Sequence, residues 1–84
     1  MENNSIVLAE TILQDATDYI GNDMEKFCAD HYALETIRNN ESFRQTVIDE
    51  VVSLPEEYAE SCANQEEAAK FVWAMYKKWA YGNQ

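Results

Sequence analysis

Apolar residues recur at intervals of three and four along most of this sequence, and this spacing places them on one side of an α-helix. The clearest case is the segment 5–20, in which the apolar residues share one arc when successive positions are rotated by about 100°. They are Leu8, Ala9, Ile12, Leu13, Ala16, Tyr19 and Ile20. No segment alternates apolar and polar residues as a strand does. The chain has only two glycines and one proline, which argues against a turn-rich all-β fold, so we expect an all-α protein.

Residues that start and stop helices divide the chain into segments. Asn22 with Glu25 three positions later resembles a capping box, and Pro55 forces a boundary. Gly21 and Gly82 suit helix ends, because glycine adopts positive φ without a Cβ penalty. The prediction is a compact bundle of four longer helices, at about 5–20, 23–38, 41–53 and 65–81, plus one short helix at about 55–61. With 84 residues, the whole range 1–84 is expected to form a single acidic helical domain.

The charge of the chain excludes some partners. Sixteen acidic and six basic residues give a net charge of −10, which argues against direct binding to nucleic acid or to an anionic membrane. The charge is also unevenly distributed. Residues 1–67 carry all 16 acidic residues and three basic ones, giving −13, whereas residues 68–84 carry three lysines and no acidic residue, giving +3. The last predicted helix is therefore basic and apolar within an acidic molecule.

Few residues are suited to catalysis or metal binding. His31 is the only histidine, and Cys28 lies three positions before it, on a neighbouring part of the same predicted helix. A zinc site needs about four ligands, and Cys28, His31 and Cys62 supply three. A small enzyme or metal protein built on these residues is one alternative. The preferred expectation is a non-enzymatic protein with no catalytic residues, no metal and no cofactor.

The sequence gives no sign of export. The N-terminal residues contain neither a basic region nor an apolar stretch of signal-peptide length, and no apolar run approaches the ~20 residues that span a bilayer. We expect a cytoplasmic protein that makes no membrane contact. In that compartment Cys28 and Cys62 are expected to be reduced thiols rather than a disulfide.

Acidic residues on several predicted helices form the first candidate interaction surface. The candidate contact residues are Asp15, Asp18, Asp49, Glu50, Glu56, Glu57 and Glu60. Such a surface imitates the phosphate rows of a nucleic acid and competes for the Lys and Arg side chains of a partner protein. The simpler alternative is that these residues only keep the protein soluble.

By size, charge and expected compartment, the chain is similar to small acidic inhibitors made by phages and mobile elements. Those proteins bind host or defence proteins that handle nucleic acid, and no sequence motif accompanies this similarity. The resemblance implies an inhibitor that occludes a basic surface on a protein partner.

Aromatic residues near the C-terminus form the second candidate surface. The segment 65–81 has an apolar arc of about 200°, wider than the ~100° of an ordinary surface helix. Its large side chains include Phe71, Trp73, Tyr76 and Trp79. They predict either a central helix wrapped by the others or the interface of a homodimer, in which a small regulatory or structural protein would enlarge its core.

Overall fold

The computed structural model describes residues 2–27 and 30–82, and within these ranges the chain is all-α with no strand. The described residues form the helices α1 (Glu2–Asn22), α2 (Met24–Phe27), α3 (His31–Asn39), α4 (Glu41–Ser53), α5 (Glu56–Ser61) and α6 (Gln65–Tyr81). The expected all-α bundle with four longer helices is thereby confirmed. Within the described ranges, no helix is both long and apolar enough to cross a membrane.

Local caps explain why several helices begin and end where the sequence predicts. The Asn40 side chain accepts a hydrogen bond from the Phe43 N–H at 2.9 Å, and that of Asn64 accepts one from the Glu67 N–H at 3.0 Å. These bonds satisfy N–H groups that have no partner in the first helical turn, so α4 and α6 begin as predicted. Gly82 ends α6 with a φ of 74° and donates its N–H to the Lys78 carbonyl.

The helix predicted at 23–38 is wrong as one continuous element, because the structure has α2 and α3 in its place. Asp30 has an extended backbone, with φ −112° and ψ 175°, and its side chain accepts a hydrogen bond from the Ala33 N–H at 2.8 Å. An aspartate in this position caps a new helix instead of continuing the previous one. Helix α3 therefore begins as a new helix at His31.

The predicted end of the first helix is also wrong. Gly21 does not stop the helix, since α1 continues through it to Asn22, and among the described residues Gly82 is the glycine with positive φ. The Asp23 N–H bonds to the carbonyls of Tyr19 and Ile20, so the last turn closes after the glycine. The start is likewise earlier than the predicted position 5, at Glu2.

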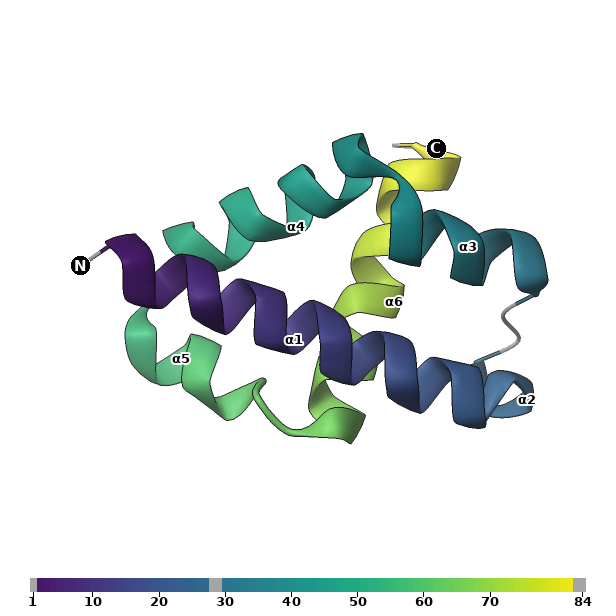
Figure 1. Ribbon diagram of the computed structural model, residues 1–84, viewed down its shortest axis with the longest axis horizontal. Helices are drawn as coiled ribbons and strands as arrows, with labels where there is room; N and C mark the ends of the chain where they lie inside the picture. Colours follow the sequence, from purple (N-terminus) through teal and green to yellow (C-terminus); the bar gives the residue numbers. More distant parts are fainter. Residues whose placement is uncertain (1, 28–29, 83–84) are drawn as a thin grey trace.

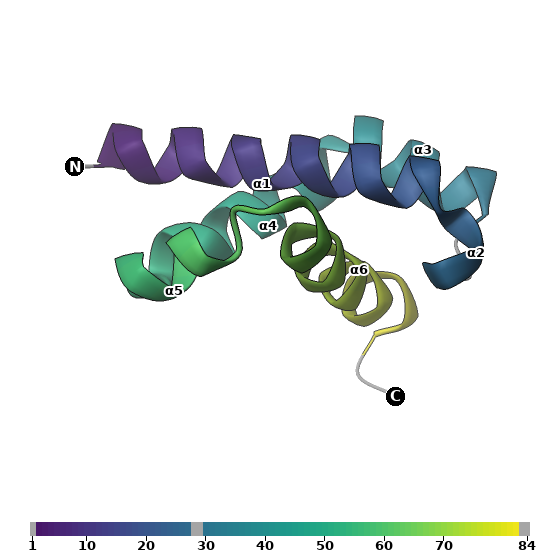
Figure 2. The same cartoon turned by 90° about the horizontal axis from the view of Figure 1, so that it is seen from below.

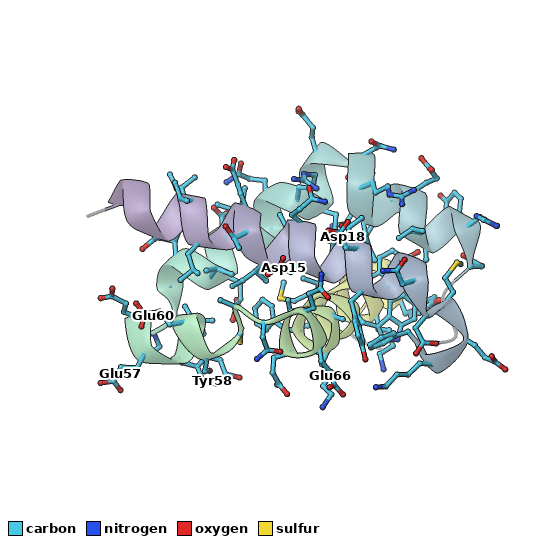
Figure 3. The ribbon with its side chains drawn as sticks, turned by 60° about the horizontal axis from the view of Figure 1, so that its bottom comes forward. Asp15, Asp18, Glu57, Tyr58, Glu60 and Glu66 are labelled. Atoms are coloured by element: carbon cyan, nitrogen blue, oxygen red, sulfur yellow. The ribbon has the colours of Figure 1, made fainter. Side chains whose placement is uncertain are left out.

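Helix α1 is the longest element, and the other helices pack along it. It runs across α6, against which it packs most extensively, and α4 lies beside it (Figure 1). Seen from below, α5 and α6 lie on one side of α1, and α4 passes behind it (Figure 2). Helix α5 and the beginning of α6 form the lower edge of the view in Figure 3, where Glu57, Tyr58 and Glu66 lie at the surface.

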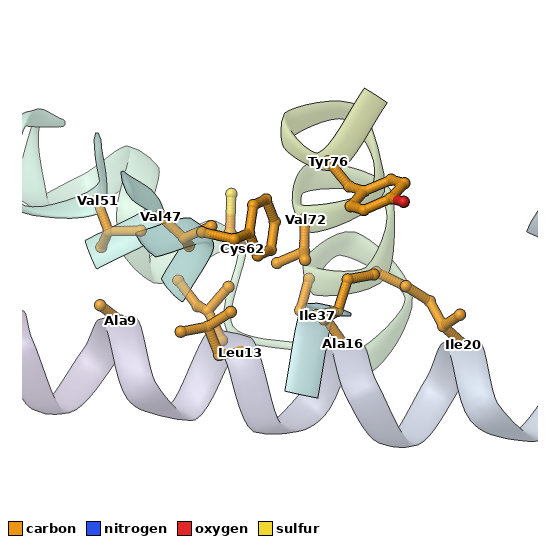
Figure 4. Close-up of a cluster of buried hydrophobic side chains, with 14 of the residues drawn as sticks. Ala9, Leu13, Ala16, Ile20, Ile37, Val47, Val51, Cys62, Val72 and Tyr76 are labelled. Atoms are coloured by element: carbon orange, nitrogen blue, oxygen red, sulfur yellow. The ribbon is translucent and has the colours of Figure 1, made fainter. Parts of the chain in front are cut away.

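The core is a single cluster, and the predicted apolar side of α1 contributes many of its residues. Its fully enclosed large side chains are Phe43, Ile12, Leu13, Ile20, Ile37, Val47, Val51 and Val72. Figure 4 shows members from α1, α4 and α6 converging. Ala16 of α1 and Ala68 and Ala69 of α6 are also fully buried, and their small side chains let the two helices approach closely.

Candidate functional site

The predicted acidic contact residues are accessible but come from three helices. Asp15 is half-buried and the other six are exposed. Asp15 and Asp18 lie on α1, Asp49 and Glu50 on α4, and the remaining three on α5. Figure 3 shows those labelled on α1 and α5 along one face of the molecule.

Two of the α5 residues line a groove between α1, α5 and the end of α4. This groove has a volume of about 380 Å³, and we call it the acidic-rimmed groove. Its lining consists of Ser5, Val7, Leu8, Thr11, Val51, Leu54, Glu56, Ala59 and Glu60. Val7 is 60% exposed despite its apolar side chain. The lining therefore combines carboxylates with an accessible apolar floor, and none of its described residues is basic.

The acidic surface continues from this groove along α1. Thr11 lines the groove, Asp15 follows four residues later and Asp18 three residues after that, so the three share one side of the helix. Asp49 and Glu50 do not line the groove. Helix packing thus unites part of the predicted set and leaves the α4 pair on a separate element.

Three of the six basic residues pair with carboxylates outside the predicted contact set. Lys26 Nζ lies 3.1 Å from Glu66 Oε2, and Lys70 Nζ lies 3.6–3.8 Å from carboxylate oxygens of Glu67 and Glu66. Arg38 pairs with Glu35 on α3. Within the described residues, none of the seven predicted contact residues has a cationic partner within 4.0 Å. Ion pairs among the described residues therefore leave the negative charge of these seven side chains uncompensated.

The pair between Lys26 and Glu66 joins α2 to α6. Hydrogen bonds to the Tyr19 hydroxyl and to Glu66 raise the pKa of Lys26, and the hydrogen bond from Lys26 lowers the pKa of the Glu66 carboxyl. Lys26 Nζ also lies 5.5 Å from the centroid of the Tyr19 ring. Both side chains of the ion pair remain nearly half exposed, so solvent screens the attraction.

The predicted aromatic residues separate into two groups. Trp73, Tyr76 and Trp79 line a second groove, between α3 and α6, with a volume of about 450 Å³. We call it the aromatic groove. Its full lining is Asp30, Tyr32, Ala33, Thr36, Asn40, Trp73, Tyr76, Trp79, Ala80 and Tyr81. Phe71 does not line it and instead packs, half-buried, against the core.

The rings of the aromatic groove are held by the core beneath them. Phe43 meets the rings of Tyr76 and Trp79 edge-on, with centroids 5.9 and 5.4 Å away. Tyr76 is only 4% exposed and stacks on Trp73 at 5.3 Å. Figure 4 shows its ring beside the buried cluster. Burial, with smaller contributions from Tyr81, Asp30 and Tyr32, raises the pKa of the Tyr76 hydroxyl.

Sequence reasoning missed the part of this groove that precedes α4, including Asp30 and Tyr32. Tyr32 is 77% exposed and Asp30 caps α3, and both face residues of α6 that are distant in the sequence. Asp30 could have been predicted as a helix cap, because aspartate commonly precedes a helix and accepts the N–H of the residue three positions later. Tyr32 had a weaker signal, namely an aromatic residue off the apolar side of its helix.

Of the residues of the metal or enzyme alternative, the structure describes His31, which is exposed at the start of α3, and Cys62, which follows α5. Cys28, and with it the disulfide alternative, lies outside the described residues. Cys62 is buried among apolar side chains, and this burial raises the pKa of its thiol. Among residues 2–27 and 30–82, no three His, Cys, Asp or Glu side chains are placed to hold one metal ion.

Comparisons with known proteins add no assignment. The chain matches no protein-family model, no curated protein and no solved structure.

Proposed function

We propose that this protein is a non-enzymatic binding protein whose acidic α1–α5 face docks onto a basic surface of a partner protein. The observation that carries the proposal is the acidic-rimmed groove, in which Glu56 and Glu60 stand beside an accessible apolar floor. Neither carboxylate has a cationic partner among the described residues. A partner's Lys or Arg side chains would supply the missing charge.

The charge of this face and its apolar surface act over different distances. The net charge of −10 attracts a basic surface over distances comparable to the Debye length, which speeds association. Contact then buries Val7 and Leu8, whose apolar surface adds affinity that does not depend on charge. A protein bound in this way occludes the basic surface that its partner uses for nucleic acid, as an inhibitor of the phage or mobile-element type does.

The test compares two triple variants of equal net charge. E56Q/E57Q/E60Q neutralises the α5 carboxylates, and E10Q/E25Q/E35Q neutralises three exposed carboxylates that do not line the acidic-rimmed groove. Each tagged protein is used to capture binders from a lysate at low ionic strength, followed by elution with salt. We expect basic proteins that are retained by the unaltered chain and by the control triple but not by the α5 triple. Equal capture by both triples would contradict the proposal.

A homodimer built through the aromatic C-terminal helix is the second candidate. Trp79 is 37% exposed and Tyr81 59% exposed, although both are large side chains at the end of α6. Burial of these rings between two copies would stabilise the folded state by mass action. This candidate predicts a melting temperature that rises with protein concentration, and sedimentation equilibrium would measure the dimer directly.

A further inference from the structure

The lining of the aromatic groove is unusual in its chemistry. Both tryptophans of the protein, Trp73 and Trp79, lie in it together with Tyr32, Tyr76 and Tyr81. Among the described residues of the lining, Asp30 is the one with a carboxyl group, and none is basic. Five aromatic rings and a carboxylate thus surround one hollow of side-chain size.

Three features of this hollow favour a positive charge. The faces of aromatic rings attract cations, most strongly in tryptophan. Asp30 uses Oδ1 to accept the Ala33 N–H at 2.8 Å, which leaves the second carboxylate oxygen able to accept from a ligand. Trp79, Ala80 and Tyr81 belong to the last turn of α6, where the helix dipole places partial negative charge.

The polar groups of the lining distinguish between cations. A quaternary ammonium has no N–H to donate, whereas this hollow is lined by the Asp30 carboxylate and by the Thr36 hydroxyl, which donates to the Tyr32 carbonyl and keeps lone pairs that can accept. A guanidinium is planar, stacks on aromatic faces and carries five N–H donors in a fixed arrangement suited to a carboxylate. The guanidinium therefore uses both the rings and the acceptors.

We propose that the aromatic groove is a recognition site for an arginine side chain of a partner protein, with the guanidinium stacked on the tryptophan rings and donating to Asp30. This site lies between α3 and α6, on elements other than the α1–α5 face, and does not rest on the function proposed for that face. A single arginine held in this way is expected to bind with a dissociation constant on the order of 1 mM.

The two tryptophans make the site directly measurable. Their fluorescence is followed while N-acetyl-arginine amide is added at constant ionic strength, and N-acetyl-citrulline amide serves as an uncharged probe of nearly the same shape. We expect a saturable change with the arginine probe, at least fivefold weaker binding of the citrulline probe, and weaker binding of N-acetyl-lysine amide. Equal responses to arginine and citrulline, or to arginine and lysine, would overturn the assignment.

Variants tie the signal to the groove. Asp30→Asn removes the charge but keeps the cap, because asparagine caps helices as well as aspartate does. Asp23→Asn is its matched control, since Asp23 Oδ1 accepts the Lys26 N–H at 3.3 Å at the start of α2 but does not line the groove. We expect Asp30→Asn to weaken arginine binding at least fivefold and Asp23→Asn to leave it unchanged; equal effects contradict the proposal.

A further variant and one dilution series complete the test. Tyr32→Leu removes a ring that is 77% exposed, so the fold is expected to survive and arginine binding to weaken. Unchanged binding in Tyr32→Leu contradicts the stacking of the cation among these rings. Tryptophan fluorescence that changes on dilution without any probe would show that a second copy fills the groove, and this outcome also overturns the proposal.

Discussion

The acidic-rimmed groove and the aromatic groove are similar in volume, at about 380 and 450 Å³, and in the part of the chain that the structure describes no basic residue lines either of them. They differ in how their negative character arises. The first has carboxylates on exposed side chains at the edge of an apolar floor, and the second has rings packed on the core with one carboxylate beside them. Charge acts over a long range and is screened by salt, whereas rings act at contact and are not. Binding to the first groove should therefore weaken in salt more steeply.

The two grooves also differ in how strongly they depend on the fold. The floor of the aromatic groove is Tyr76, which is buried against Phe43, whereas the acidic-rimmed groove exposes Val7 at the surface. Residues that hold a groove together from within the core cannot be changed without cost. Stability measurements can therefore test whether one groove is part of the core and the other peripheral.

The largest expected effect comes from Phe43→Ala. Phe43 is fully buried and contacts the rings of Tyr76 and Trp79, so its loss should lower the free energy of unfolding by about 3–5 kcal/mol. Val7→Ala, at the other groove, should change it by no more than about 0.5 kcal/mol. Urea denaturation followed by circular dichroism measures both. A loss below about 1 kcal/mol in Phe43→Ala would show that the aromatic groove does not rest on the core.

An intermediate effect is expected at Asp30, which is both the cap of α3 and the carboxylate of the aromatic groove. Asp30→Ala leaves the Ala33 N–H without its partner and should lower the free energy of unfolding by about 1 kcal/mol, whereas Asp30→Asn should cost only a few tenths. The same denaturation measurement compares them. Equal losses in the two variants would mean that the charge of Asp30, and not its cap, stabilises α3.

Asp30 also shows where sequence reasoning was sufficient and where it was not. The bounds of α4 and α6 could be predicted, because Asn40 and Asn64 act on N–H groups only three residues away. The break at Asp30 has the same local cause, but the prediction did not use Asp30 as a cap and continued one helix through 23–38. Gly21 caused the opposite error, because the prediction places a helix end there. Tertiary packing continues α1 through this residue despite its low helix propensity.

The candidate sites follow the same division between local and tertiary causes. Glu56 and Glu60 lie on the same side of the short helix α5, and the aromatic residues near the C-terminus lie together on α6. The sequence could therefore group each set. It could not place Val7 beside Glu60, or Tyr32 beside Trp79, because each pairing depends on how separate helices pack. For the same reason Phe71 was grouped with residues from which the structure separates it.

A smaller effect is expected at Gly21, which lies close to residues of α3 and not to α5. A Cβ at this position would lie 3.7 Å from atoms of Arg38 and Leu34, which is ordinary contact. Gly21→Ala should therefore raise the free energy of unfolding by about 0.5 kcal/mol, since alanine loses less backbone entropy in a helix. A rise in the urea midpoint at constant slope checks this. A lowered midpoint would contradict the continuous α1 that the structure describes.

The smallest expected effect separates a paired carboxylate from those of the acidic-rimmed groove. Lys26 lowers the pKa of Glu66, so the pair stabilises the fold while Glu66 is ionised. That contribution is present above the ordinary carboxyl pKa of 4.5 and is lost as the pH falls through the lowered value in the folded state. The melting temperature of the unaltered protein should consequently fall slightly more than that of Glu66→Gln on acidification, and 1 M salt should remove the difference. Glu60→Gln is the control, since it removes a carboxylate that has no cationic partner within 4.0 Å among the described residues. An equal change in the acid-induced fall of the melting temperature in Glu60→Gln and Glu66→Gln would mean that both carboxylates are compensated within the fold. The α5 face would then no longer differ from the ion-paired surface around α2 and α6.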